Sequence, residues 1–225
     1  MKRMLLAVGV GLVLCCPWAL AGDKEFAYID LQPKANHKLT DPFHSGSEGN
    51  DLSDLPKGEQ VFAKVKFKLG DGLIQLGSKR TKDLPDMVEG IEVNRSFVRL
   101  HLLHATGYGA YGNEGDELFV ADDTPIGEYK IHYADKTTAA IPIVYGRDVR
   151  DWWDWDKSKA VTRGKLGWEG TNDFAKKFDV KIRLYVTTWE NPHPEKRVAR
   201  IDYLRTGESV CAPFCVAMST EGTKK

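Results

Sequence analysis

The chain has 225 residues, of which 32 are Lys or Arg and 32 are Asp or Glu, so its formal net charge is zero. That balance argues against a protein that coats nucleic acid, because such proteins normally carry a basic excess. Hydrophobic residues make up 42% of the chain and charged residues 28%, which excludes a disordered chain and is typical of a soluble globular protein. The length fits one large all-β domain or two small domains.

The N-terminal residues have the three parts of a secretory signal peptide. Residues 2–3 (Lys-Arg) are charged, residues 4–14 form an apolar run, and residues 19–21 (Ala-Leu-Ala) give a small-x-small cleavage site. The sequence therefore predicts a signal peptide over residues 1–21. It also predicts an exported chain, residues 22–225, in the periplasm, in the cell envelope or outside the cell.

Two alternatives to cleavage remain open. A retained membrane anchor is disfavoured, because a span needs about 20 apolar residues and this run is shorter. A lipoprotein signal is suggested by Cys15 and Cys16, but Leu14 precedes Cys15 and a second Cys precedes Cys16. Lipoprotein signals have small residues at those places. We expect no membrane span once the signal peptide is removed.

The rest of the chain is dominated by short alternating patterns. Apolar and polar residues alternate most clearly over residues 61–69, 98–104, 128–133 and 180–186, a period of two that is typical of half-buried strands. Clusters of Gly, Pro, Asn and Asp bound these segments, as turns between strands require. Further strands are predicted at residues 26–31, 74–77, 90–94, 139–145, 161–168, 197–204 and 210–218.

Helical periodicity is almost absent. Only residues 172–178 indicate one or two helical turns, and residues 34–58 form a polar, turn-rich segment that is too short to count as a domain. About ten short strands without interleaved helices favour an antiparallel sandwich or barrel over a parallel α/β sheet. We predict a single all-β domain, an antiparallel β-sandwich.

The polar N-terminal segment offers hard oxygen ligands near turns. These are Asp30, Asn36, Asp41, Asn50 and Asp51. A structural calcium ion is possible there, but the spacing is not that of a calcium-binding loop. We expect no other cofactor.

Two histidines, His101 and His104, have a spacing found in some metal sites. Because alternate residues of a strand point to opposite faces, their rings should diverge. His104 shares the apolar face with Leu100 and Leu102, so a hydrogen-bonded core histidine is the favoured interpretation.

A glycine-rich loop covers residues 107–115 and contains Tyr108 and Tyr111. It lacks the strand-to-helix setting and the Lys-Ser/Thr ending of a phosphate-binding loop. We predict a flexible loop there.

The least ordinary composition in the chain is a segment with three tryptophans and four aspartates, residues 148–156. Indole faces can cover the C–H face of a sugar ring while carboxylates accept hydrogen bonds from its hydroxyls. The alternative is that the aromatic rings cap one end of the core or form a cation–π site. At least one tryptophan should be partly exposed. The candidate ligand-binding residues are Trp152, Trp153, Trp155, Asp151 and Asp154.

Two more tryptophans, Trp168 and Trp189, each close a predicted strand beside a turn. They are expected to anchor the edge of the core.

Two cysteines, Cys211 and Cys215, follow the predicted signal peptide, and an exported protein permits a disulfide between them. In a continuous strand their Cα atoms would lie about 13 Å apart, beyond the roughly 7 Å limit for a bridge. A disulfide would form only if Pro213 broke the strand into a turn. We expect free thiols.

A series of short motifs is spread over about residues 26–219. The motifs are Asp30-Leu31, Gly49-Asn50-Asp51-Leu52, Leu55-Pro56-Lys57-Gly58, Leu102-Leu103-His104-Ala105-Thr106, Gly127-Glu128-Tyr129, His132-Tyr133-Ala134-Asp135, Asp151-Trp152-Trp153, Trp189-Glu190-Asn191-Pro192 and Pro213-Phe214-Cys215-Val216-Ala217. As a set they resemble a family of exported bacterial domains, the galactose-binding-like, carbohydrate-binding-module-like jelly rolls of planctomycete-type bacteria. The resemblance implies a jelly-roll sandwich with a binding role, and it supplies no catalytic residues. Cys211 and Cys215 depart from it, because small or aliphatic residues are expected in the last strand.

Three functions follow as hypotheses. The favoured one is a non-catalytic module that binds carbohydrate or a cell-envelope glycan. The second is a structural or protein-interaction domain of the envelope, with an envelope protein as its partner. The third is a carbohydrate-active hydrolase, but the sequence has no serine-nucleophile motif and selects no carboxylate pair.

Overall fold

The computed structural model describes residues 24–223, except residues 45, 111–112 and 156–158. The predicted signal peptide, with Cys15 and Cys16, lies outside the described residues. Within them, no helix has the length and apolar character of a membrane span.

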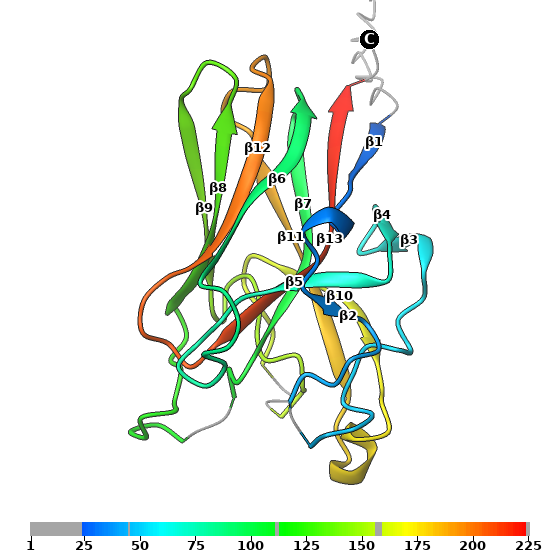
Figure 1. Cartoon of the computed structure of the whole chain (residues 1–225), viewed down its shortest axis with the longest axis vertical. Coiled ribbons are helices and arrows are strands. Elements are labelled where there is room, and N and C mark those ends of the chain that lie inside the picture. The colour runs from blue at the N-terminus through cyan, green and yellow to red at the C-terminus, as the bar shows by residue number, and fades with distance from the viewer. Residues whose placement is uncertain (1–23, 45, 111–112, 156–158, 224–225) are drawn as a thin grey trace, which may run out of the picture.

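The described chain is almost entirely β-strand, with two short 3₁₀ helices (Figure 1). The strands are β1 (Lys24–Ile29), β2 (His37–Lys38), β3 (Gly58–Phe62), β4 (Val65–Leu69), β5 (Gly72–Gln75), β6 (Met87–Arg95), β7 (Arg99–Gly107), β8 (Pro125–Tyr133), β9 (Thr138–Val144), β10 (Lys165–Gly170), β11 (Ile182–Glu190), β12 (Val198–Arg205) and β13 (Ala212–Thr223). The 3₁₀ helices are η1 (Gln32–Lys34) and η2 (Ala175–Phe178).

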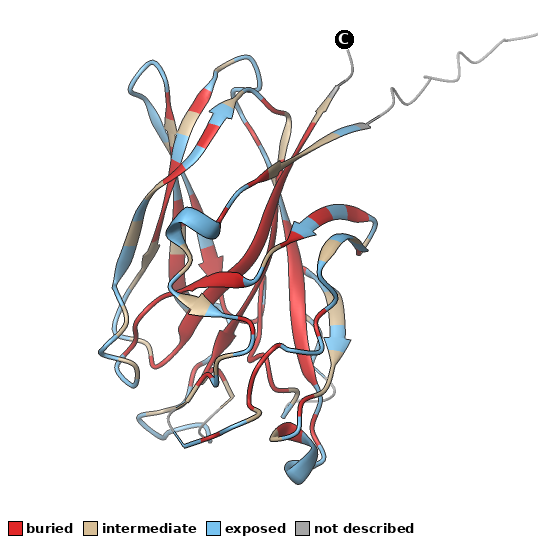
Figure 2. Ribbon diagram, turned by 45° about the vertical axis from the view of Figure 1, so that its right-hand side comes forward, coloured by how far each residue is buried: buried red, intermediate tan, exposed pale blue. Residues whose placement is uncertain are grey.

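Two antiparallel sheets pack against each other and form a β-sandwich, as predicted. One sheet has the order β10-β11-β7-β13-β5-β2, with β1 also paired to β13, and the other has the order β6-β12-β8-β9. Strands β3 and β4 form a separate hairpin. The long strand β13 pairs with β7 on one side, and on its other side first with β5 and then with β1. In Figure 2 the buried residues run along β13 and its partners β7 and β5.

The interior between the sheets contains a small polar cluster within an apolar core. His104 on β7 bonds the Thr187 hydroxyl on β11 through Nε2 at 2.9 Å, and its Nδ1 lies 3.3 Å from the Tyr129 hydroxyl on β8. Burial lowers the pKa of His104 to about 4, so the ring is neutral at physiological pH. His101, by contrast, forms a hydrogen bond between its Nδ1 and the Thr188 hydroxyl at 2.8 Å. The prediction of a core histidine is confirmed for His104.

The prediction of one strand over residues 61–69 is wrong. The chain reverses at Ala63 and Lys64, whose φ angles are 47° and 69°, and β3 and β4 pair as a hairpin. Two consecutive residues with positive φ form the turn that suits two-residue hairpins. The sequence there lacks the Asn-Gly or Asp-Gly signal of such turns, and for that reason the alternation appeared continuous. Val61 consequently lies on the outer face, 63% exposed.

The positions of the other elements agree with the patterns, with shifts at their ends. The expectation of half-buried strands is wrong for residues 98–104 and 180–186, because β7 and the first part of β11 are buried on both faces. The β2 strand was not predicted, β10 begins at Lys165 rather than residue 161, and β13 continues to Thr223. The helical turn expected within residues 172–178 is η2. It is stabilised at its start by the Asn172 side chain, which accepts the Ala175 N–H at 2.6 Å.

Both described cysteines are free, as expected, and both are buried. β13 runs without interruption through Pro213 and Cys215, so no turn brings the two thiols together. Burial raises the pKa of both thiols to about 12.

We expect both thiols to resist labelling in the native protein, because a buried thiol above its ordinary pKa supplies almost no reactive thiolate. Iodoacetamide labelling at mildly alkaline pH, followed by mass spectrometry, should show no modification of native protein. In denaturant without reductant, both cysteines should be modified. A mass two hydrogens lower and no labelling in denaturant would instead demonstrate a disulfide.

Candidate functional site

One end of the sandwich, the lower end in Figure 1, carries a pocket built from loops that lie far apart in sequence. Its volume is about 430 Å³. The walls come from the segment after β2, the β5–β6 and β7–β8 connections, the β9–β10 connection and the η2 region. The lining residues are His44, Arg80, Tyr108, Asp151, Trp152, Trp153, Trp155, Phe174 and Phe178.

The β9–β10 connection, which carries the tryptophans, is braced by paired arginines and aspartates. The buried Arg150 guanidinium donates to both carboxylate oxygens of Asp122 at 2.9 Å. Asp148, also buried, accepts from Arg163 Nε at 2.6 Å and from the Val144 backbone N–H at 2.8 Å. These pairs hold an irregular segment in one conformation without regular strand pairing.

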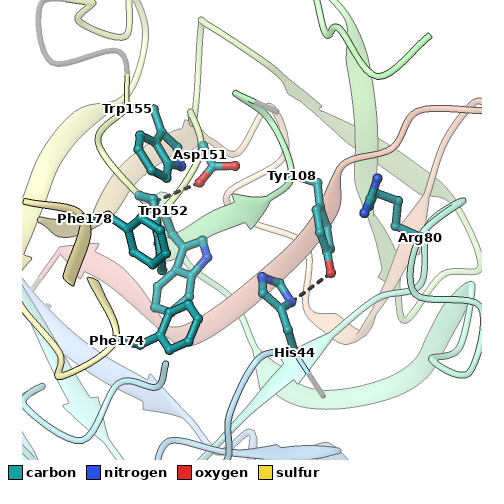
Figure 3. Close-up of a pocket in the computed structure, with 9 residues that line it drawn as sticks. His44, Arg80, Tyr108, Asp151, Trp152, Trp155, Phe174 and Phe178 are labelled. Atoms are coloured by element: carbon teal, nitrogen blue, oxygen red, sulfur yellow. Dashed lines mark hydrogen bonds between the residues drawn. The ribbon is translucent and has the colours of Figure 1, made fainter. Parts of the chain in front are cut away.

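The aromatic wall of the pocket is a cluster of rings in contact with one another (Figure 3). Ring centroids lie 5.3 Å apart for Trp153 and Trp155, and 6.0 Å apart for Trp155 and Phe178. Trp155 is 48% exposed and Phe178 is 50% exposed, whereas Trp153 is buried and donates its Nε1–H to Asn50 Oδ1 at 3.1 Å. Trp155 is therefore the partly exposed tryptophan that the sequence predicts.

Trp152 is covered by the core, with only 1% of its surface exposed. Its ring packs against Phe43 and Phe214, with centroid distances of 4.4 Å and 6.1 Å. The capping interpretation therefore describes Trp152, whose covered ring supports the pocket floor and offers no free face to a ligand.

The Asp151 carboxylate joins the two walls of the pocket. Its Oδ2 accepts the backbone N–H of Gly109 at 2.6 Å and of Ala110 at 3.3 Å, and its Oδ1 accepts that of Trp153 at 2.8 Å. Burial raises its pKa to about 6, against the opposite influence of these three donors and of Arg183. Asp151 is thus occupied in fixing loops, and this differs from the expectation that it accepts ligand hydroxyls.

Asp154 does not line the pocket. Its Oδ1 accepts the Lys181 backbone N–H at 2.9 Å, and its own N–H donates to the Lys181 carbonyl at 3.0 Å. It lies instead beside a neighbouring groove.

The polar wall faces the aromatic one (Figure 3). The Tyr108 hydroxyl and His44 Nδ1 are hydrogen-bonded at 2.8 Å, and the Arg80 guanidinium carbon lies 5.1 Å from the centre of the Tyr108 ring. Burial lowers the pKa of His44, which favours the uncharged form of its ring. This wall provides neutral donors and acceptors together with one cation.

Five of the lining residues were not predicted from the sequence. Tyr108 was noted only as part of a flexible loop, and the i, i+4 spacing of Phe174 and Phe178 was the one local signal for an aromatic face. His44 and Arg80 carried no signal. The missed residues are His44, Arg80, Tyr108, Phe174 and Phe178.

The five residues considered for calcium use their oxygens in separate hydrogen bonds. Asp30 accepts from Gln32, Asn36 from Gln75, Asp41 from Lys38, Asn50 from Trp153, and Asp51 from Ser53. Across residues 24–223 with their gaps, no three His, Cys, Asp or Glu side chains gather as a metal site would require.

Trp168 and Trp189 are both half-buried and pack against the core. Both lie within edge or near-edge strands, Trp168 on β10 and Trp189 on β11. The prediction that they anchor the edge of the core is confirmed.

Comparison of the chain with protein-family models, curated proteins and solved structures found no match. The class that the structure defines is an all-β sandwich with a loop-built aromatic pocket at one end. The galactose-binding-like family stays a prediction of the sequence motifs.

Proposed function

We propose that this protein is an exported, non-catalytic module that binds a saccharide in the pocket between Trp155 and Tyr108. The observation that carries the proposal is the pair of half-exposed rings, Trp155 and Phe178, on the wall of a concave loop-built site. Aromatic rings exposed to solvent inside a hollow are unfavourable in the free protein. A ligand that covers these rings removes apolar surface from water, which favours binding.

The chemistry of the two walls supports a sugar ring as the ligand. A pyranose has apolar C–H faces and polar hydroxyl edges, and the pocket offers aromatic faces on one side and hydrogen-bonding groups on the other. His44 and Tyr108 can both donate to and accept from hydroxyls. A wholly apolar ligand would cover the polar atoms of this wall and remove them from water, which is unfavourable.

The binding role is favoured over hydrolysis by the state of the acidic residue in the pocket. A glycosidase needs two carboxylates flanking the scissile bond. Asp151 is the single carboxylate among the described lining residues, and three backbone N–H groups occupy it.

The Trp155→Ala variant tests the proposal. A glycan array probed with the wild-type protein should identify a saccharide ligand, and titration calorimetry should show at least about tenfold weaker binding by the variant, because a central aromatic contact typically contributes about 1–2 kcal/mol. The melting temperature should hardly change, since Trp155 is half-exposed.

Phe119→Ala is the matched control, because Phe119 is also a partly exposed aromatic residue but lines a different hollow. Its affinity for the saccharide should equal that of the wild type. Absence of any saccharide ligand would reject the proposal in favour of an envelope protein as partner. Equal loss of affinity in both variants would show that the pocket is not the binding site.

A further inference from the structure

A second hollow, a groove of about 790 Å³, is lined by chain neighbours of the Trp155–Phe178 pair. Asp154 and Asp179 line it, and they directly precede Trp155 and follow Phe178 in the chain. The two rings themselves form a T-shaped pair on the wall of the pocket, which we call the Trp155–Phe178 ridge. The pocket and the groove are thus lined by adjacent residues of the same two segments, 154–155 and 178–179.

The groove has an aromatic residue of its own, Trp168 on the edge strand β10. Its indole lies directly against Gly170, where a Cβ atom would come within 2.2 Å of the ring. The absence of a side chain at position 170 therefore permits this ring position. The groove thus repeats the combination of aromatic surface and polar rim seen in the pocket.

The charges of the groove select against anionic ligands. Its acidic residues are Asp54, Asp154, Glu169 and Asp179, and its basic residues are Lys176 and Lys181. Both lysines are already paired, Lys181 with Glu169 and Lys176 with Asp173 at 3.0 Å. A ligand carrying carboxylates or sulfates would meet an excess of negative charge, whereas hydroxyl groups find acceptors.

We propose that the ligand is an uncharged linear oligosaccharide, with one part of the chain in the pocket, one part on the Trp155–Phe178 ridge and one part in the groove against Trp168. The inference rests on the proposed saccharide function and adds its ligand class: a chain rather than a single sugar, and a neutral chain rather than an acidic one.

The test is titration calorimetry with cello-, xylo-, manno- and galacto-oligosaccharides of increasing length, alongside acidic oligogalacturonides. In the series that binds, affinity should rise by about tenfold or more between the disaccharide and the tetrasaccharide, the gain expected for one further aromatic contact. Oligogalacturonides should bind more weakly than neutral chains of equal length. These measurements on the wild-type protein need no variant.

Trp168→Ala should abolish the gain from chain length and leave disaccharide affinity unchanged. Leu166→Ala is the matched control, because Leu166 is an exposed apolar residue on the same strand and lines neither hollow. Since Trp168 also packs against the core, circular dichroism must first show that the variant is folded. Trp168→Phe should retain part of the gain.

The outcomes separate this inference from the proposed function. Binding that is independent of chain length, or preference for the acidic chains, would overturn the inference while a saccharide function stood. No binding by any saccharide would overturn both.

Discussion

Replacing Trp152 by alanine is expected to lower the free energy of unfolding by about 3–5 kcal/mol, the range for large aromatic residues removed from a core. The ring is almost fully buried between Phe43 and Phe214. Its backbone is also fixed, since the Trp152 N–H donates to the Thr106 carbonyl at 2.8 Å and its carbonyl accepts the Arg183 N–H at 2.7 Å. The surroundings therefore have little freedom to close the cavity.

Equilibrium unfolding in urea measures this effect. Trp155→Ala is the matched control, because Trp155 is the same residue type three positions away but is half-exposed. The control should change stability by about 0.5 kcal/mol or less, as is usual at surface positions. Equal losses in the two variants would contradict the assignment of Trp152 to the core and Trp155 to the surface.

The second large effect is an unusual pH dependence from Asp151. Its folded pKa is raised to about 6 from an ordinary 3.8, so between these values the folded protein holds a proton that the unfolded chain has lost. The contribution of Asp151 to the free energy of unfolding is therefore fully present below its ordinary pKa of 3.8, and it is lost as the pH rises through about 6. The full change is on the order of 3 kcal/mol, by the conversion of about 1.4 kcal/mol for each pKa unit.

Urea unfolding of the wild type and of Asp151→Asn across this pH range isolates the contribution, because asparagine does not titrate. The stability of the wild type relative to the variant should fall as pH rises from about 4 to about 6. Other groups, such as His104, titrate equally in both proteins and cancel. A difference that rises with pH would mean that the three backbone donors outweigh burial and lower the pKa of Asp151.

The fold class could be predicted from the sequence because strand alternation is a local signal. Residues 128–133 revealed a strand because one of its faces is buried. Residues 180–186 alternate in sequence in the same way, although β11 is buried on both faces there because Arg183 and Tyr185 are also covered. The β3–β4 hairpin could not be seen, because Ala63 and Lys64 adopt positive φ without the residues that usually announce such a turn. Its conformation is imposed by the pairing of the two strands.

The candidate site was only half predictable for a similar reason. The tryptophan and aspartate segment is contiguous in sequence and stood out by composition. Its opposite wall, with His44 and Tyr108, is assembled by loops brought together only when the sandwich closes. Which tryptophan is exposed was also undetermined, because the segment makes only isolated bridges such as Trp153 with Ile182, and strand periodicity does not apply to it.

A crystal structure of the protein with the saccharide that binds best in the array would locate the binding site directly. We expect a sugar ring seated on Trp155 and Phe178, with hydroxyls within hydrogen-bond distance of His44 or Tyr108. A saccharide bound on another face, with Trp155 and Phe178 still uncovered, would contradict this expectation.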